Sequence, residues 1–185
     1  MLQWIQVNPA GCNTVPSAGR ELRFIVVHYT AMKTSEMGRA LYISRRFEDA
    51  KYPSADFIVD NEFVVQFNPD LKNRCCKHCG GRGDECSESS LYGICTNENS
   101  IGVEMCSENA AGKVTFPGDP NYYFTDAVLE NAAELIRSLM TEYHIDLSHV
   151  VRHYDVNGKL CPGVPGWFGP EEAAPGWAEF KNRLR

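Results

Sequence analysis

The 185-residue sequence lacks long apolar runs, since continuous stretches such as Phe24–Val27 are far too short to cross a bilayer. It also lacks a basic excess: 24 acidic residues outnumber 18 Lys and Arg, and the net charge is −6. Proteins that bind a phosphate backbone usually carry such an excess, so nucleic acid is not an expected partner. The N-terminus shows no basic segment followed by an apolar one. We therefore expect no secretory signal, and we expect the protein to be made in the cytoplasm.

Internal repeats and low-complexity segments are missing as well. The length predicts one domain over residues 1–185, long enough to bury a core without disulfides or metals. The apolar fraction of 43% and the charged fraction of 23% are close to globular averages, which excludes a disordered or collagen-like chain. A monomer is assumed.

Apolar runs and helical periodicities alternate along the chain, which predicts a single α/β domain with a central mixed sheet flanked by helices. Residues 1–22 show no periodicity and are expected to form an irregular lead-in. Strands are expected at 24–27, 57–59, 63–67, 101–105 and 150–153, and helices at 36–51, from Thr125 to Tyr143 and at 177–184. The strand pair 57–59 and 63–67 reads as a hairpin.

Eight cysteines are present, and five of them lie in a polar, Gly- and Cys-rich segment over residues 68–100. This segment is expected to be a loop insertion. Without a secretory signal, reduced thiols or metal ligands are the default interpretation. Disulfides or free thiols are the first interpretation of this cluster, and a second, structural zinc site, which a CxxC pair supports modestly, is the next. The candidate ligands of that structural zinc are Cys76, Cys79, Cys86 and Cys95.

Three residues form a candidate metal site. His28 and His153 each follow a short apolar run, so each lies where a strand ends at the edge of the sheet. Cys161 comes eight residues after His153, near enough for a loop to fold back onto it. Two imidazoles and one thiolate with an open fourth position are a known catalytic zinc set. The plainer alternative is two hydrogen-bonded surface histidines and a small core cysteine.

Two charged residues near these positions are candidate catalysts. Glu104 interrupts the apolar run 101–105. It either faces solvent by simple alternation or points into the site, where it would act as a general base. Lys159 lies two residues before Cys161 and would project near the metal to stabilise an oxyanion, unless it is only a solvated loop lysine.

Six motifs occur in the order found in one family, and together they cover about Phe24 to Pro162. The chain resembles the type-2, zinc-dependent N-acetylmuramoyl-L-alanine amidases, a group that includes phage endolysins, bacterial autolysins and peptidoglycan recognition proteins. The last of the motifs is highly specific. The motifs are His28-Tyr-Thr, Ser54-Ala-Asp-Phe-Ile-Val-Asp60, His78-Cys-Gly-Gly81, Tyr92-Gly-Ile-Cys-Thr-Asn97, Asn99-Ser-Ile-Gly-Val-Glu-Met-Cys106 and Arg152-His-Tyr-Asp-Val-Asn-Gly-Lys-Leu-Cys-Pro162.

The resemblance implies a role for each candidate. His28, His153 and Cys161 fall on the ligands of one catalytic Zn²⁺. Glu104 falls on the catalytic glutamate of the endolysin-type members, and Lys159 on the lysine that assists the tetrahedral intermediate.

The same resemblance implies three substrate-binding residues, His78, Tyr29 and Asp56. His78 falls in the Trp-His-x-Gly segment beside the substrate groove. This chain departs from the family in two places: Lys77 replaces the usual Trp before that His, and Asp56 stands where many members have His. Neither departure touches an implied metal ligand.

The implied function is zinc-dependent hydrolysis of the amide bond between N-acetylmuramic acid and L-alanine in bacterial peptidoglycan. An endolysin of this kind would reach the cell wall after release by a holin or by lysis. One alternative is a non-catalytic peptidoglycan-binding recognition protein, a group in which the thiolate ligand is lost. Another is a cytoplasmic muropeptide-recycling amidase, whose members usually carry a carboxylate as the third ligand. Cys161 favours the endolysin or autolysin type over both.

Overall fold

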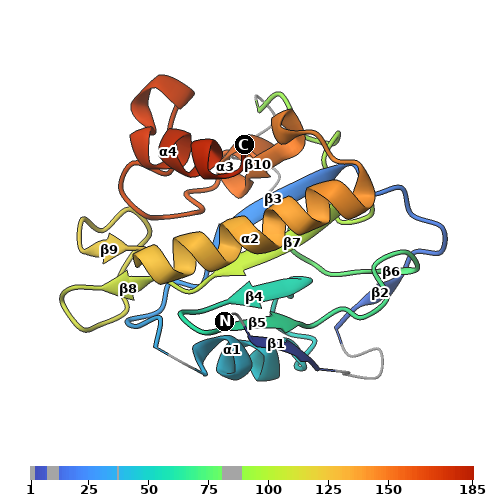
Figure 1. Cartoon of the computed structure of the whole chain (residues 1–185), viewed down its shortest axis with the longest axis horizontal. Coiled ribbons are helices and arrows are strands. Elements are labelled where there is room, and N and C mark those ends of the chain that lie inside the picture. The colour runs from blue at the N-terminus through green and yellow to red at the C-terminus, as the bar shows by residue number, and fades with distance from the viewer. Residues whose placement is uncertain (1–2, 8–12, 37, 81–88) are drawn as a thin grey trace.

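A computed structural model describes residues 3–7, 13–36, 38–80 and 89–185 of the chain (Figure 1). A six-stranded mixed sheet forms its centre. The strands Phe57–Val59 and Phe63–Gln66 form an antiparallel hairpin, and every other neighbouring pair of this sheet is parallel. This arrangement confirms the expected α/β class. In spatial order the strands are β1 (Gln3–Gln6), β5 (Phe63–Gln66), β4 (Phe57–Val59), β7 (Ser100–Met105), β3 (Phe24–Tyr29) and β10 (Val150–Arg152).

Two helices cover the sheet on opposite sides. The long helix α2 (Asp126–Tyr143) begins where expected, because the hydroxyl of Thr125 caps it by accepting a hydrogen bond from the backbone N–H of Val128 at 3.2 Å. Helix α1 (Arg39–Phe47) packs on β4 and β5 from the other side. No helix in the described ranges combines the length and apolarity that a membrane span requires.

Shorter elements complete the chain. These shorter elements are β2 (Val15–Pro16), β6 (Arg74–Cys75), β8 (Glu108–Asn109), β9 (Tyr122–Tyr123), α3 (His153–Asn157), α4 (Pro175–Arg183) and the 3₁₀ turns Leu147–His149 and Glu171–Ala173. Two small antiparallel pairs, β2 with β6 and β8 with β9, lie outside the central sheet.

Alternation along β3 and β7 separates the hydrophobic core from the site. Ile25 and Val27 of β3, like Ile101 and Val103 of β7, pack in one cluster with α2. Because successive side chains point to opposite faces of a strand, the even-numbered residues of both strands face away from α2. His28 of β3 and Glu104 of β7 are register partners and therefore lie side by side on this second face.

The expectation of an irregular lead-in over residues 1–22 is wrong in part. Residues 3–6 form β1, which extends the sheet by pairing in parallel with β5. The strand is mostly exposed, so it carries no alternation of buried and exposed residues that a sequence pattern would reveal. Helix α1 is also shorter than the expected 36–51, since it begins only after Gly38, whose φ of 84° is left-handed.

The described part of the segment 68–100 is mostly loop, as expected, but it is anchored at several points. Its strand β6 pairs with β2. The side-chain oxygen of Asn97 accepts hydrogen bonds from the backbone N–H groups of His78 and Cys79 at 2.9 and 2.7 Å. These bonds hold His78 at a fixed place over the second face of the sheet.

Candidate metal centre and active-site pocket

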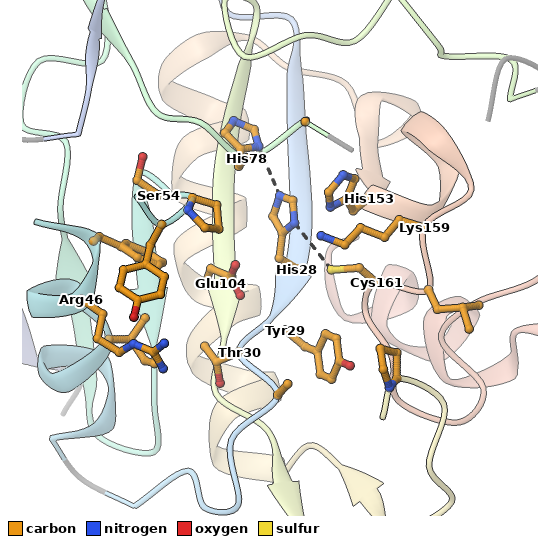
Figure 2. Close-up of a pocket in the computed structure, with 18 residues that line it drawn as sticks. His28, Tyr29, Thr30, Arg46, Ser54, His78, Glu104, His153, Lys159 and Cys161 are labelled. Carbon is orange, nitrogen blue, oxygen red and sulfur yellow. Dashed lines mark hydrogen bonds between the residues drawn. The ribbon is translucent and has the colours of Figure 1, made fainter. Parts of the chain in front are cut away.

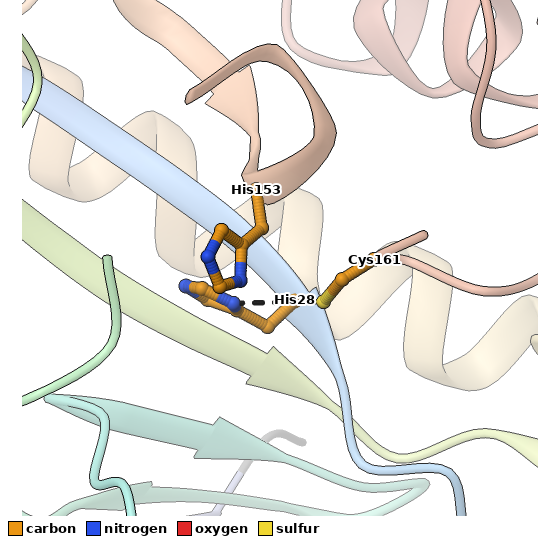
Figure 3. Close-up of side chains that lie close together, drawn as sticks. All are labelled: His28, His153 and Cys161. Atoms are coloured by element: carbon orange, nitrogen blue, oxygen red, sulfur yellow. Dashed lines mark hydrogen bonds between the residues drawn. The ribbon is translucent and has the colours of Figure 1, made fainter. Parts of the chain in front are cut away.

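His28, His153 and Cys161 converge at one end of the sheet (Figure 3). His28 lies near the end of β3, and His153 is the first residue of α3, directly after the neighbouring strand β10. The backbone N–H of Tyr154 donates to the carbonyl of Cys161 at 2.8 Å and closes the loop between them. One potential ligand atom from each of the three residues lies within 4.8 Å of the others, and the Cys161 Sγ is 3.6 Å from His28 Nδ1.

The donor set fits a single zinc ion. All three side chains are buried, and His153 Nδ1 has no hydrogen-bond partner within the described part of the chain. Burial lowers the pKa of His28 well below its usual value and that of His153 to about 3, so both imidazoles are neutral, as metal ligands must be. Burial likewise raises the pKa of Cys161 to about 12, and a bound cation would offset this by stabilising the thiolate.

Glu104 and Lys159 flank this cluster (Figure 2). One carboxylate oxygen of Glu104, Oε2, is buried and has no hydrogen-bond partner among the described residues. Desolvation raises the pKa of Glu104 to about 8, partly opposed by the positive charge of Lys159. A carboxyl group that changes charge near neutral pH, beside a candidate metal centre, has the properties of a general acid and base.

The raised pKa of Glu104 predicts a pH-dependent stability. The unfolded chain loses this proton near pH 4.5, the folded chain only near pH 8, so the group destabilises the fold progressively as pH rises between these values. In chelator-treated protein, Glu104→Gln is expected to be more stable than the unsubstituted chain, by a few kcal/mol, at about pH 9, with the difference shrinking towards about pH 5. Thermal unfolding across this range measures it, and a difference independent of pH would contradict the assignment.

A cavity of about 330 Å³ opens beside the cluster, and Figure 2 shows the side chains around it. Tyr29 and His78, both expected to be substrate-binding, line it. Arg46 and Tyr52 line it from the side of α1, with the guanidinium of Arg46 4.7 Å from the centre of the Tyr52 ring. Sequence reasoning missed these two residues, because a cation in the last turn of a helix and an aromatic residue shortly after it match no motif.

Asp56 does not fit its expected substrate-binding role. The residue is fully buried and does not line the cavity. Its carboxylate accepts hydrogen bonds from the backbone N–H of Gly102 and from the side-chain amide of Asn68, both at 2.7 Å. The family resemblance implied a groove residue, but Asp56, directly before β4, packs against the loop that carries His78, with its carboxylate 3.8 Å from His78 Nε2.

The candidate structural zinc set is not brought together by the described residues. Cys76 packs in the hydrophobic cluster under α1. Cys95 packs in a different cluster, formed by residues of β3, β10 and α3, and Cys79 packs against that second cluster. Cys86 lies outside the described residues. Within the described ranges, the His28, His153 and Cys161 cluster is the only group of three or more His, Cys, Asp or Glu with ligand atoms close enough to hold a metal.

Among the described residues, a buried His–His–Cys cluster lies beside a lysine and a carboxylate oxygen that has no partner, an arrangement typical of metal-dependent hydrolases. The family comparison narrows this class. The family model described as N-acetylmuramoyl-L-alanine amidase matches residues 18–164, which is most of the chain. The chain therefore belongs to the N-acetylmuramoyl-L-alanine amidase family.

Curated relatives agree with this assignment. A probable N-acetylmuramoyl-L-alanine amidase of Bacillus licheniformis is 31% identical over 140 residues, covering 75% of this chain and 35% of the relative. The N-acetylmuramoyl-L-alanine amidase XlyA of Bacillus subtilis is 32% identical over 155 residues, covering 83% of this chain and 44% of XlyA. The chain thus spans less than half the length of either relative.

Solved structures share the whole fold. A mutant endolysin from Bacillus subtilis superposes with a TM-score of 0.68 at 28% identity, and the match covers 100% of both chains. The catalytic domain of XlyA superposes with the same TM-score at 27% identity, again over 100% of both chains. The similarity to the XlyA catalytic domain therefore extends over the whole of this sequence.

Proposed function

We propose that this chain is a zinc-dependent amidase of the endolysin type, which hydrolyses the bond between N-acetylmuramic acid and L-alanine in peptidoglycan. The observation that carries the proposal is the convergence of His28, His153 and Cys161 beside Glu104 in one cavity. Family membership supports the substrate class, and relatives named as amidases and endolysins support action at the cell wall.

The three candidate ligands would hold Zn²⁺ through two neutral imidazoles and one thiolate, and all three side chains line the cavity. When bound, the ion supplies Lewis-acid chemistry to the scissile carbonyl and to the attacking water. The chain's own residues then have defined tasks, and the first of them is proton transfer.

Glu104 accepts the proton of the attacking water and passes it to the departing L-alanine nitrogen. Its buried, unpartnered oxygen and its pKa of about 8 suit both halves of this task. Lys159 lines the same cavity and, as Figure 2 shows, directs its amine towards the cluster. There it stabilises the negative charge that develops on the carbonyl oxygen.

Digestion of purified Gram-positive sacculi tests the proposal. Mass spectrometry of the products is expected to show stem peptides with a free L-alanine amine, released only when zinc is present. A chelator abolishes release and added zinc restores it. Products cut at a glycosidic or peptide–peptide bond instead would contradict the assigned bond.

The same assay separates the two alternatives. Binding to sacculi without release under any zinc condition would indicate a recognition protein, and activity confined to soluble muropeptide fragments would indicate a recycling enzyme. The Glu104 oxygen without a partner among the described residues and the thiol of Cys161 favour an enzyme over a recognition protein, because a purely binding groove has no need of either group. The thiol as third candidate ligand, where recycling enzymes usually have a carboxylate, favours the endolysin type.

A further inference from the structure

His78 contacts the candidate metal ligand His28 directly, although it comes from a loop 50 residues further along the chain. Its Nδ1 lies 3.2 Å from His28 Nε2, and the two rings meet edge to face with centroids 5.2 Å apart (Figure 2). Both side chains are buried. The contact involves the nitrogen of His28 that faces away from Cys161, since the other nitrogen, Nδ1, faces that sulfur.

The proton positions along this contact follow from the partners of His78. The hydroxyl of Ser100 donates to the carbonyl oxygen of Thr96, so its oxygen remains an acceptor for His78 Nε2, 3.4 Å away. The carboxylate of Asp56, 3.8 Å from the same nitrogen, also favours a proton there. His78 in its neutral form therefore carries its proton on Nε2 and leaves Nδ1 as an acceptor.

This assignment determines the tautomer of His28. When His78 is neutral and its Nδ1 accepts, the 3.2 Å contact is a hydrogen bond only if His28 carries its own proton on Nε2 and donates it. The Nδ1 lone pair of His28 is then free and directed at the cluster. Cys79 Sγ, 3.5 Å from His78 Nδ1, is only a weak acceptor and offers little competition for a proton at that position.

Gly102 provides the space that the arrangement needs. A Cβ atom at this position of β7 would come within 2.7 Å of His78 Cγ, closer than real contacts allow. The imidazole thus packs on bare backbone, and the N–H of that same glycine is held by Asp56. The buried Asp56 and Gly102 together set the height of the His78 ring above the sheet.

We infer that His78 is a positioning residue for the metal centre: supported by Ser100, Asp56 and Gly102, it fixes the orientation and tautomer of His28 so that Nδ1 is presented to the ion. Outer hydrogen-bond partners of ligating histidines commonly act in this way. The role is additional to the substrate contact expected for His78, which also lines the cavity, and it gives buried Asp56 a function at the site. The inference rests on the proposed zinc centre.

Two substitutions at this position test the inference. His78→Leu removes the acceptor, whereas His78→Gln keeps an acceptor for His28 and a donor for Ser100. Zinc affinity of the metal-stripped chain, measured by competition with a chromophoric chelator, is expected to fall roughly 10- to 100-fold in His78→Leu and to recover largely in His78→Gln. His149→Leu is the matched control, since His149 packs edge to face on Phe24, 5.0 Å between ring centroids, and belongs to no metal cluster.

Melting temperatures in excess chelator separate positioning from folding. A folded His78→Leu variant with unchanged zinc affinity would overturn the inference, while the loss of affinity in a variant that melts normally supports it. If His78→Leu does not fold, the zinc affinities of His78→Gln and Ser100→Ala are compared instead. The Ser100→Ala variant is expected to bind zinc more weakly than the His78→Gln variant. The reverse order would overturn the inference.

A second readout needs no metal and no activity. Long-range ¹H–¹⁵N spectra of the metal-free chain are expected to show His28 protonated on Nε2, and a proton on Nδ1 would overturn the inference. This result is distinct from failure of the proposed function, because a chain that binds no zinc would refute the metal centre while the tautomer measurement still decides the role of His78.

Discussion

Replacing Glu104 by Gln is expected to reduce amidase turnover by roughly 10²- to 10⁴-fold while leaving zinc binding intact. The amide has nearly the shape of the carboxylate but cannot take the proton of the attacking water. The position tolerates a neutral group well, because burial already favours the uncharged form of this side chain. Initial rates of stem-peptide release at saturating zinc, with zinc content measured on the same samples, give both quantities.

The control for this experiment is Glu134→Gln, which makes the same chemical change at an exposed position of α2 outside the cavity. It is expected to release stem peptide at the unsubstituted rate. Near-normal turnover in the Glu104→Gln variant would remove this residue from the proton-transfer role.

Removing the thiolate is expected to have the second large effect. Cys161→Ser should weaken zinc binding by roughly 100-fold or more and abolish release of stem peptide at micromolar zinc, because only two imidazole ligands remain. The substitution is small and the loop stays closed by the bond from the Tyr154 N–H to the carbonyl of residue 161. Isothermal titration with zinc and the sacculus assay on the same preparation measure the two effects.

Cys106→Ser provides the matched control, since Cys106 is also buried but packs in the cluster under α1. It is expected to bind one zinc ion with unchanged affinity, whatever it loses in stability from burying a hydroxyl. Unchanged zinc affinity in Cys161→Ser, with Cys106→Ser as the variant that loses the metal, would show that the ion binds elsewhere.

Most of the fold was accessible from the sequence because its periodic elements carry strong local signals. The continuous apolar run at 24–27 predicted a strand buried on both faces, and β3 is buried along its whole length. The Thr125 cap and the apolar stripe after it predicted α2. The strand β1 escaped prediction, since an exposed edge strand is defined by backbone pairing with β5 and not by a pattern of its own side chains.

The candidate metal ligands could also be identified from the sequence, but the residues that hold these ligands in place could not. His28, His153 and Cys161 stand out because two histidines end apolar runs and a cysteine lies within loop reach. Asp56 and His78 looked like groove residues, since a motif shows neither depth nor direction. The structure buries Asp56 away from the cavity, whereas His78 lines the cavity and also contacts His28.

Sequence patterns alone predicted the α/β class, the hairpin, the main helix and the residues that can hold a metal, because each depends on local periodicity or on donor chemistry. The face of β7 that carries Glu104 could be assigned only from the fold, since alternation allows either a solvent-facing or a site-facing side chain. It also decided the partner of His78. That contact joins a loop to a strand 50 residues away, and it depends on the parallel register of β3 with β7 and on the missing side chain of Gly102 between them.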